Sequence, residues 1–117
     1  MYNNSLEEVL EWLDELMDLY ADILPRIAQV NDLPVEKLVL ALNDAPYHLP
    51  PVMYLGRNDK PHTLELYEYS SSKSLECEVE AYEGDINSNL KDHPEYLQPI
   101  KERFAAECER IGVRCLQ

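Results

Sequence analysis

The strongest pattern in the chain is a helical repeat of apolar side chains over residues 5–30. Apolar residues recur there every three or four positions, which is the spacing of one face of an amphipathic helix: Leu6, Val9, Leu10, Leu13, Leu16, Met17, Tyr20, Ile23, Leu24 and Ile27. Ser5 and Glu8 have the spacing of a capping box, which satisfies backbone N–H groups at a helix start. The pattern predicts a long helix, with Pro25 kinking it or beginning a separate last turn.

A second, shorter helix is expected directly after the first. Asn31 and Asp32 can cap it, and Pro34 suits its first turn, where a missing N–H costs little. Its apolar side would consist of Val35, Leu38, Val39 and Leu42. Three prolines then predict a loop, at positions 46, 50 and 51.

Beyond these prolines the apolar period changes from helical to two. The pattern predicts a short strand from Val52 to Gly56 and alternating strands over Thr63–Tyr69 and Leu75–Tyr82, with residues 70–73 as a hairpin turn. In the last strand the alternation assigns one set to the core: Leu75, Cys77, Val79 and Ala81. It assigns the other set to solvent: Glu76, Glu78, Glu80 and Tyr82.

The rest of the chain predicts a polar loop over 84–91 and a final helix. Asp92 and Glu95 have capping-box spacing, and Gly112 is expected at the helix C-terminus. The core stripe of this helix would be Ile100, Phe104, Cys108 and Ile111. We therefore expect an α+β fold in one domain over 1–117, a three-stranded antiparallel sheet covered on one face by three helices in the order α-α-β-β-β-α.

The charge balance narrows the classes of partner. The chain has 23 acidic residues against 10 Lys and Arg, a net charge of −13, while its hydrophobic content of 45% is ordinary for a globular protein. Such acidity opposes direct binding to DNA, RNA or an anionic membrane and favours a basic protein partner. Three cysteines without a C-x-x-C pair, together with an N-terminus unlike a signal peptide, predict a cytoplasmic protein.

The sequence offers little for catalysis. Its three histidines lack metal-ligand spacing: His48, His62 and His93. Three glycines cannot build a phosphate-binding loop, and residues 85–89 resemble the start of a calcium loop without its glycine and bidentate glutamate. We expect no catalytic residue, no metal and no cofactor.

Two acidic clusters are the best candidates for a binding surface. The first helix carries seven acids before its first base, Arg26, and residues 65–85 hold seven acids against Lys73 alone. Both could be solvated faces, but like charges four residues apart on a helix cost a few tenths of a kcal/mol each, and lysines would avoid that cost. The predicted partner-binding residues are Glu65, Tyr67, Tyr69, Glu76, Glu78, Glu80 and Tyr82 on the sheet, and Glu11, Trp12 and Glu15 on the helix.

These features predict a non-enzymatic inhibitor or adaptor that engages a basic protein. Immunity proteins, antitoxins and nucleic-acid-mimicking inhibitors of nucleases or defence systems are the physical analogues. Carboxylates two residues apart on a strand lie about 6.5–7 Å apart, close to the phosphate repeat of a nucleic-acid strand.

Two other functions are kept open. Trp12 and Leu19 widen the apolar stripe of the first helix, which would also suit a homodimeric secretion or assembly chaperone. An enzyme using Glu78 and Glu80 is the least favoured, because exposed carboxylates on one strand lack an enclosing pocket.

Overall fold

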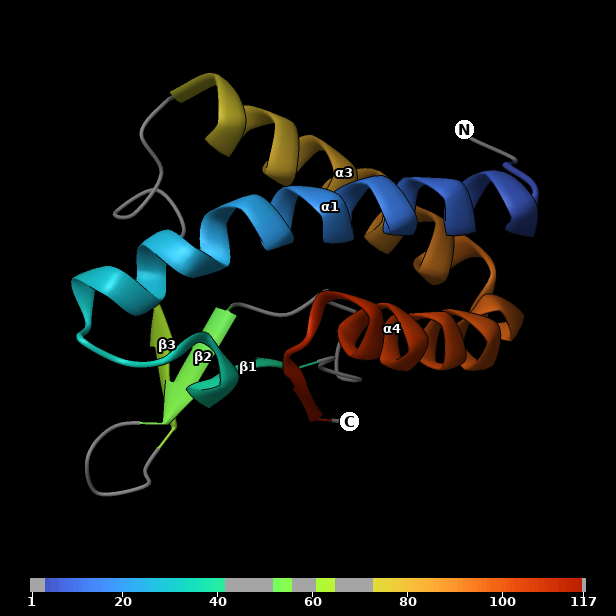
Figure 1. The fold of residues 1–117 in the computed structure, drawn as a ribbon. Coiled ribbons are helices and arrows are strands. Elements are labelled where there is room, and N and C mark those ends of the chain that lie inside the picture. The colour runs from blue at the N-terminus through green and yellow to red at the C-terminus, as the bar shows by residue number, and fades with distance from the viewer. Residues whose placement is uncertain (1–3, 42–51, 56–60, 65–72, 117) are drawn as a thin grey trace.

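The computed structural model describes residues 4–41, 52–55, 61–64 and 73–116, and it describes the side chains of 4–29, 31–40 and 77–115. Within these residues the fold is mostly helical. Three α-helices form one layer, and four short strands form a sheet near the C-terminal half of the first helix (Figure 1).

The first helix, α1 (Leu6–Val30), confirms the predicted helix and its start. The Ser5 side chain caps it by accepting a hydrogen bond from the backbone N–H of Glu8 at 3.3 Å. Pro25 lies inside this helix, so the last turn is not a separate one. Most of the apolar stripe is buried: Val9, Leu13, Leu16, Met17, Tyr20, Ile23, Leu24 and Ile27.

Two helices cover the two flanks of α1. Figure 1 shows α3 (Lys73–Asp92) and α4 (Leu97–Ile111) packed against it on either side, with α3 running in the opposite direction. A single 3-10 turn, η2 (Pro94–Tyr96), joins α3 to α4. The core lies where the three helices meet, because the buried apolar residues of α3 and α4 join the stripe of α1 in one cluster.

The sheet has the strand order β3-β2-β1-β4. Its strands are β1 (Leu38–Ala41), β2 (Val52–Leu55), β3 (Pro61–Leu64) and β4 (Arg114–Leu116). The pairs β1–β2 and β2–β3 are antiparallel, whereas β1 and β4 are parallel. The predicted strand near Val52 is therefore confirmed as β2.

The predicted fold class is wrong. In place of the second helix the structure has one 3-10 turn, η1 (Val35–Lys37), followed by strand β1. The reason is that Leu38, Val39 and Leu40 are all buried. A run of residues without a solvent-facing side is typical of a central strand and not of an amphipathic helix. The parallel partner of β1, strand β4, was not predicted.

The second correction concerns residues 75–91. The predicted strand over 75–82 and the polar loop over 84–91 together form α3, so the predicted sheet of strands at 52–56, 63–69 and 75–82 does not form. The buried side of α3 consists of Val79, Ile86, Leu90 and the polar Asn89, which follow the helical period. Apolar and polar residues alternate at 75–82 as they would in a strand. Polar residues on the buried side of α3 interrupt the apolar stripe that would have indicated a helix.

Other predictions near these segments have mixed outcomes. The capping box at Asp92 and Glu95 is wrong, because Asp92 is the last residue of α3 and no side chain caps η2. The final helix is confirmed as α4, with Ile100, Phe104 and Cys108 buried. The 65–72 part of the predicted strand and hairpin lies outside the described residues.

Gly112 ends α4 as predicted. It adopts the left-handed conformation, with φ 82°, and its N–H donates to the carbonyl of Cys108 at 3.0 Å. This turn directs the chain from α4 into β4.

Two glycine substitutions should change stability in opposite directions. Gly84 lies inside α3, where a Cβ atom would have no neighbour within 4 Å, so Gly84→Ala should stabilise the protein by about 0.5–1 kcal/mol. Gly112→Ala should destabilise it by about 1 kcal/mol, because a side chain at positive φ is strained. Urea unfolding followed by circular dichroism measures both. A clearly destabilising Gly84→Ala would contradict the helical assignment of this segment.

Candidate protein-interaction surface

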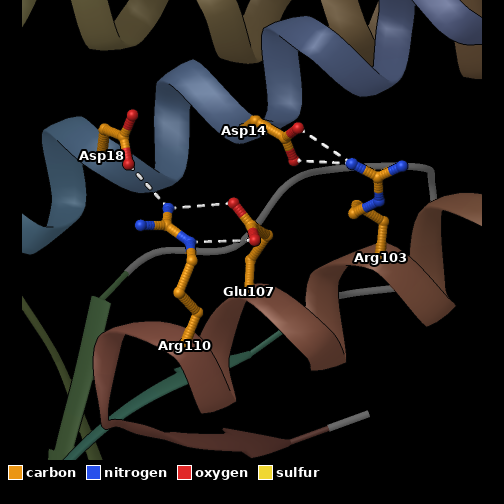
Figure 2. Close-up of polar contacts among 5 residues, drawn as sticks. All are labelled: Asp14, Asp18, Arg103, Glu107 and Arg110. Atoms are coloured by element: carbon orange, nitrogen blue, oxygen red, sulfur yellow. Dashed lines mark hydrogen bonds and ion pairs between the residues drawn. The ribbon is translucent and has the colours of Figure 1, made fainter.

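Two acids on the flank of α1 that faces α4 are paired with arginines. Arg103 of α4 donates from one Nη1 to both carboxylate oxygens of Asp14, at 2.8 and 3.1 Å (Figure 2). Burial raises the pKa of Asp14, and the hydrogen bond from Arg103 opposes that effect. The contact is a partly exposed ion pair, which links the two helices and removes one negative charge from this side.

A second arginine, Arg110, contacts two carboxylates on the same flank. Arg110 donates to Asp18 of α1 at 2.6 Å and to both carboxylate oxygens of Glu107, at 2.9 and 3.0 Å (Figure 2). Glu107 is only 9% exposed, so a cationic partner offsets the cost of burying its carboxylate. Asp14 and Asp18, which have no base near them on α1 itself, are thus paired with arginines of α4.

The flank that faces α3 has a different chemistry. Glu15 accepts a hydrogen bond from the hydroxyl of Tyr82, a neutral donor that leaves the negative charge in place. This hydrogen bond, with partial burial and the charges of Glu15 and Glu78, raises the pKa of Tyr82 to about 12. The structure thus brings together residues that were predicted on two separate surfaces.

We define the acidic surface as Glu8, Glu11 and Glu15 of α1 together with Glu78 and Tyr82 of α3. In the described part of the chain, none of its four carboxylates forms an ion pair with a lysine or arginine. The pKa of Glu8 is lowered by hydrogen bonds, foremost from the Asn4 side chain. Within the described residues, the acidic surface therefore gathers four carboxylates that are not paired with a lysine or arginine.

One acid of α3 faces the core instead. The hydroxyl of Tyr20, buried on α1, donates to Glu83 at 2.8 Å. Burial is the main cause that raises the pKa of Glu83 to about 7, and the charge of Glu80 adds to it. Tyr20 and Glu83 thus form a polar contact inside the α1–α3 interface.

The predicted site residues are distributed unevenly. Glu78 and Glu80 are exposed, but on a helix two successive alternate positions point about 200° apart, so they do not share the single face predicted for a strand. Glu76 also lies on α3, in the part whose side chains are not described. Three predicted residues lie outside the described residues: Glu65, Tyr67 and Tyr69.

Trp12, Leu19 and Cys108 belong to the core or pack against it, whereas Cys77 does not. Trp12 and Leu19 are partly buried and pack against the core. Cys77, predicted to face inward, is exposed, while Cys108 is buried as predicted. Burial is the main cause that raises the pKa of the Cys108 thiol.

The structure also shows two pockets that the sequence did not predict. A pocket of about 200 Å³ lies between α1 and α3, lined by Asn4, Trp12, Asp85, Ser88 and Asn89. A second one, of about 220 Å³, lies between α1 and α4 and is lined by Glu7, Leu10, Glu11, Asp14 and Arg103. A helical reading of residues 79–90 would have placed Asp85 and Asn89 beside α1, since they lie three and seven positions after Tyr82.

Two further searches of the described residues gave negative results. No group of three or more His, Cys, Asp or Glu side chains is arranged to hold a metal ion in the described part of the chain. None of the described helices combines the length and the apolar character needed to cross a membrane.

Comparisons with protein-family models, with curated proteins and with solved structures gave no match for this chain. The function must therefore be argued from the geometry and charge of the described residues.

Replacing Glu83 with glutamine should make the protein less sensitive to pH. The folded state raises the pKa of Glu83 to about 7, so it holds the proton up to that pH, whereas an unfolded glutamate loses it near its ordinary pKa of 4.5. Between these values the unfolded state binds fewer protons, so the contribution of Glu83 to stability falls as the pH rises. Glutamine can still accept the hydrogen bond from Tyr20 and carries no charge.

The stability advantage of Glu83→Gln over the wild type should therefore grow by about 2 kcal/mol between pH 5 and pH 8, allowing for partial exposure of the group. Urea unfolding at several pH values measures it. Glu109→Gln is the matched control, because Glu109 is exposed on α4 and its replacement should give no such trend. A difference between Glu83→Gln and wild type that stays constant with pH would contradict the buried position of Glu83.

Proposed function

We propose that this protein is a non-enzymatic inhibitor or adaptor that binds a basic partner protein through the acidic surface. We further propose that it acts in the cytoplasm, because its cysteine content suits a reducing compartment. The observation that carries the proposal is a difference between the two flanks of α1. Two acids on the α4 flank are paired with arginines, whereas Glu15 on the α3 flank contacts a tyrosine.

The α4 flank supports the proposal by contrast. The chain places Arg103 and Arg110 where they neutralise Asp14 and Asp18. On the α3 flank, by contrast, Glu15 accepts a hydrogen bond from the hydroxyl of a tyrosine. Since like charges on a helix cost a few tenths of a kcal/mol per pair, a surface that retains them favours a role in which a partner supplies the cations.

The composition of the acidic surface fits recognition of a protein. Its carboxylates would speed encounter with a basic partner, and Tyr82 offers a ring that can bury area at an interface. The hydrogen bond to Glu15 also holds Tyr82 in place before a partner arrives, which lowers the ordering cost of binding.

The rival functions receive less support from the described residues. A chaperone would need an apolar surface for its clients, but α3 and α4 cover most of the stripe of α1. An enzyme built on Glu78 and Glu80 would need the two carboxylates to converge, and they diverge on α3. The spacing argument for a nucleic-acid mimic also falls, since it assumed a strand at 76–80.

Removing charge from the acidic surface should weaken partner binding. In Glu11→Gln/Glu15→Gln/Glu78→Gln, capture of basic proteins from a lysate of the source organism should fall about tenfold or more at low salt. The matched control, Glu36→Gln/Glu102→Gln/Glu109→Gln, removes the same charge from exposed positions elsewhere and should bind like the wild type. Quantitative mass spectrometry of the captured proteins makes the comparison.

The salt dependence gives a second readout of the same proposal. At 1 M NaCl the screening length is about 3 Å, so partner binding should be largely lost. Equal capture by both triple variants, or capture that 1 M NaCl leaves unchanged, would contradict an electrostatic interface on this surface.

A further inference from the structure

The pocket between α1 and α3 adjoins the acidic surface. Trp12 lies four residues after Glu8 and three before Glu15 on α1, and Asp85 lies about one turn after Tyr82 on α3, on the same side of that helix. Its volume of about 200 Å³ is below the roughly 300–1,000 Å³ typical of drug-sized ligands. The pocket is therefore suited to one side chain of a partner or to a small ion.

Two buried oxygen atoms of the pocket residues have no hydrogen-bond donor among the described residues. Asn89 is 2% exposed, and its Nδ2 donates to the backbone carbonyl of Asp85 at 2.9 Å, but its Oδ1 has no partner. The Oδ1 of Asn4 is also buried without a partner, while its Nδ2 donates to Glu8 at 3.1 Å. A buried acceptor left unsatisfied is costly, so the pocket offers two acceptor sites to a ligand that brings N–H groups.

The other pocket residues favour a positively charged ligand. Asp85 contributes an exposed carboxylate, and Ser88 contributes a hydroxyl that can accept a hydrogen bond. Trp12 contributes an indole, the best of the aromatic rings for attracting a cation. Among the described residues, no lysine or arginine lines the pocket, so an anion would meet acceptors without a compensating charge.

We propose that this pocket receives the side chain of an arginine from the basic partner, an inference that rests on the proposed function and specifies its partner. A guanidinium group carries five N–H donors in one plane and stacks on aromatic rings, so it can serve several acceptors and Trp12 together. A lysine ammonium is a compact, strongly hydrated charge with three donors, and it matches this set of groups less well.

A titration with N-acetyl-arginine amide tests the pocket without the partner. Trp12 is the only tryptophan of the chain, so its fluorescence and its indole N–H signal in NMR report on the pocket directly. We expect a saturable change with the arginine derivative, with shifts at the side-chain amides of Asn4 and Asn89. N-acetyl-lysine amide should bind several-fold more weakly, and N-acetyl-citrulline amide, which lacks the charge, about tenfold more weakly.

Two matched variants on α3 localise the effect. Asp85→Asn removes the carboxylate from the pocket and should weaken binding of the arginine derivative about tenfold. Asp92→Asn makes the same change at an exposed position of α3 outside the pocket and should leave binding unchanged. Equal binding by both variants, or no preference for arginine over citrulline, would overturn the inference and leave a pocket that holds water only.

Partner capture separates this inference from the proposed function. If Asp85→Asn and Asp92→Asn retain the partner equally while the triple variant of the acidic surface loses it, the proposed function stands and the arginine pocket fails. If the triple variant and its control retain it equally, the proposed function fails, whereas the titration still decides whether the pocket binds arginine.

Discussion

The burial of the apolar stripe of α1 is the constraint on which the rest of the described structure depends. This stripe is too wide for one neighbouring helix, and α3 and α4 cover it from two sides. Their positions then fix the rest, because a connection of four residues, 93–96, must join them and Gly112 must turn the chain toward β1. Even the polar contacts between helices, such as Tyr20 with Glu83, lie along the borders of this stripe.

The same packing determines where charge accumulates. Each neighbour of α1 presents its own side chains to the acids that border the stripe: α4 supplies arginines, and α3 supplies a tyrosine. The difference between the flanks is thus a property of the assembled helices and of no single segment. A net charge of −13 becomes informative only when its neutralised and uncompensated parts are separated in this way.

The sequence predicted an element correctly where apolar side chains recur at a regular spacing without interruption, and it failed where polar residues interrupt that spacing or no polar positions occur. Helices α1 and α4 were predicted because their apolar stripes are unbroken and end at recognisable caps, Ser5 and Gly112. Helix α3 was missed because buried Asn89 and the partly buried Glu83 interrupt its stripe, and strand β1 because Leu38–Leu40 has no polar side. Glu11, Glu15 and Glu78 of the acidic surface were predicted and Glu8 was not, and the contact of Glu15 with Tyr82 could not be assigned without the packing of the helices.

The order of the elements along the chain has a consequence for biosynthesis. Helix α1 ends at residue 30, whereas α4, the second of its covering helices, ends at residue 111. At translation rates of about 5–20 residues per second, roughly 4–16 s would pass between the synthesis of α1 and that of the last helix that buries its apolar stripe. During that interval the acids of α1 would repel other nascent copies, so the same charge would protect the chain from aggregation before folding is complete.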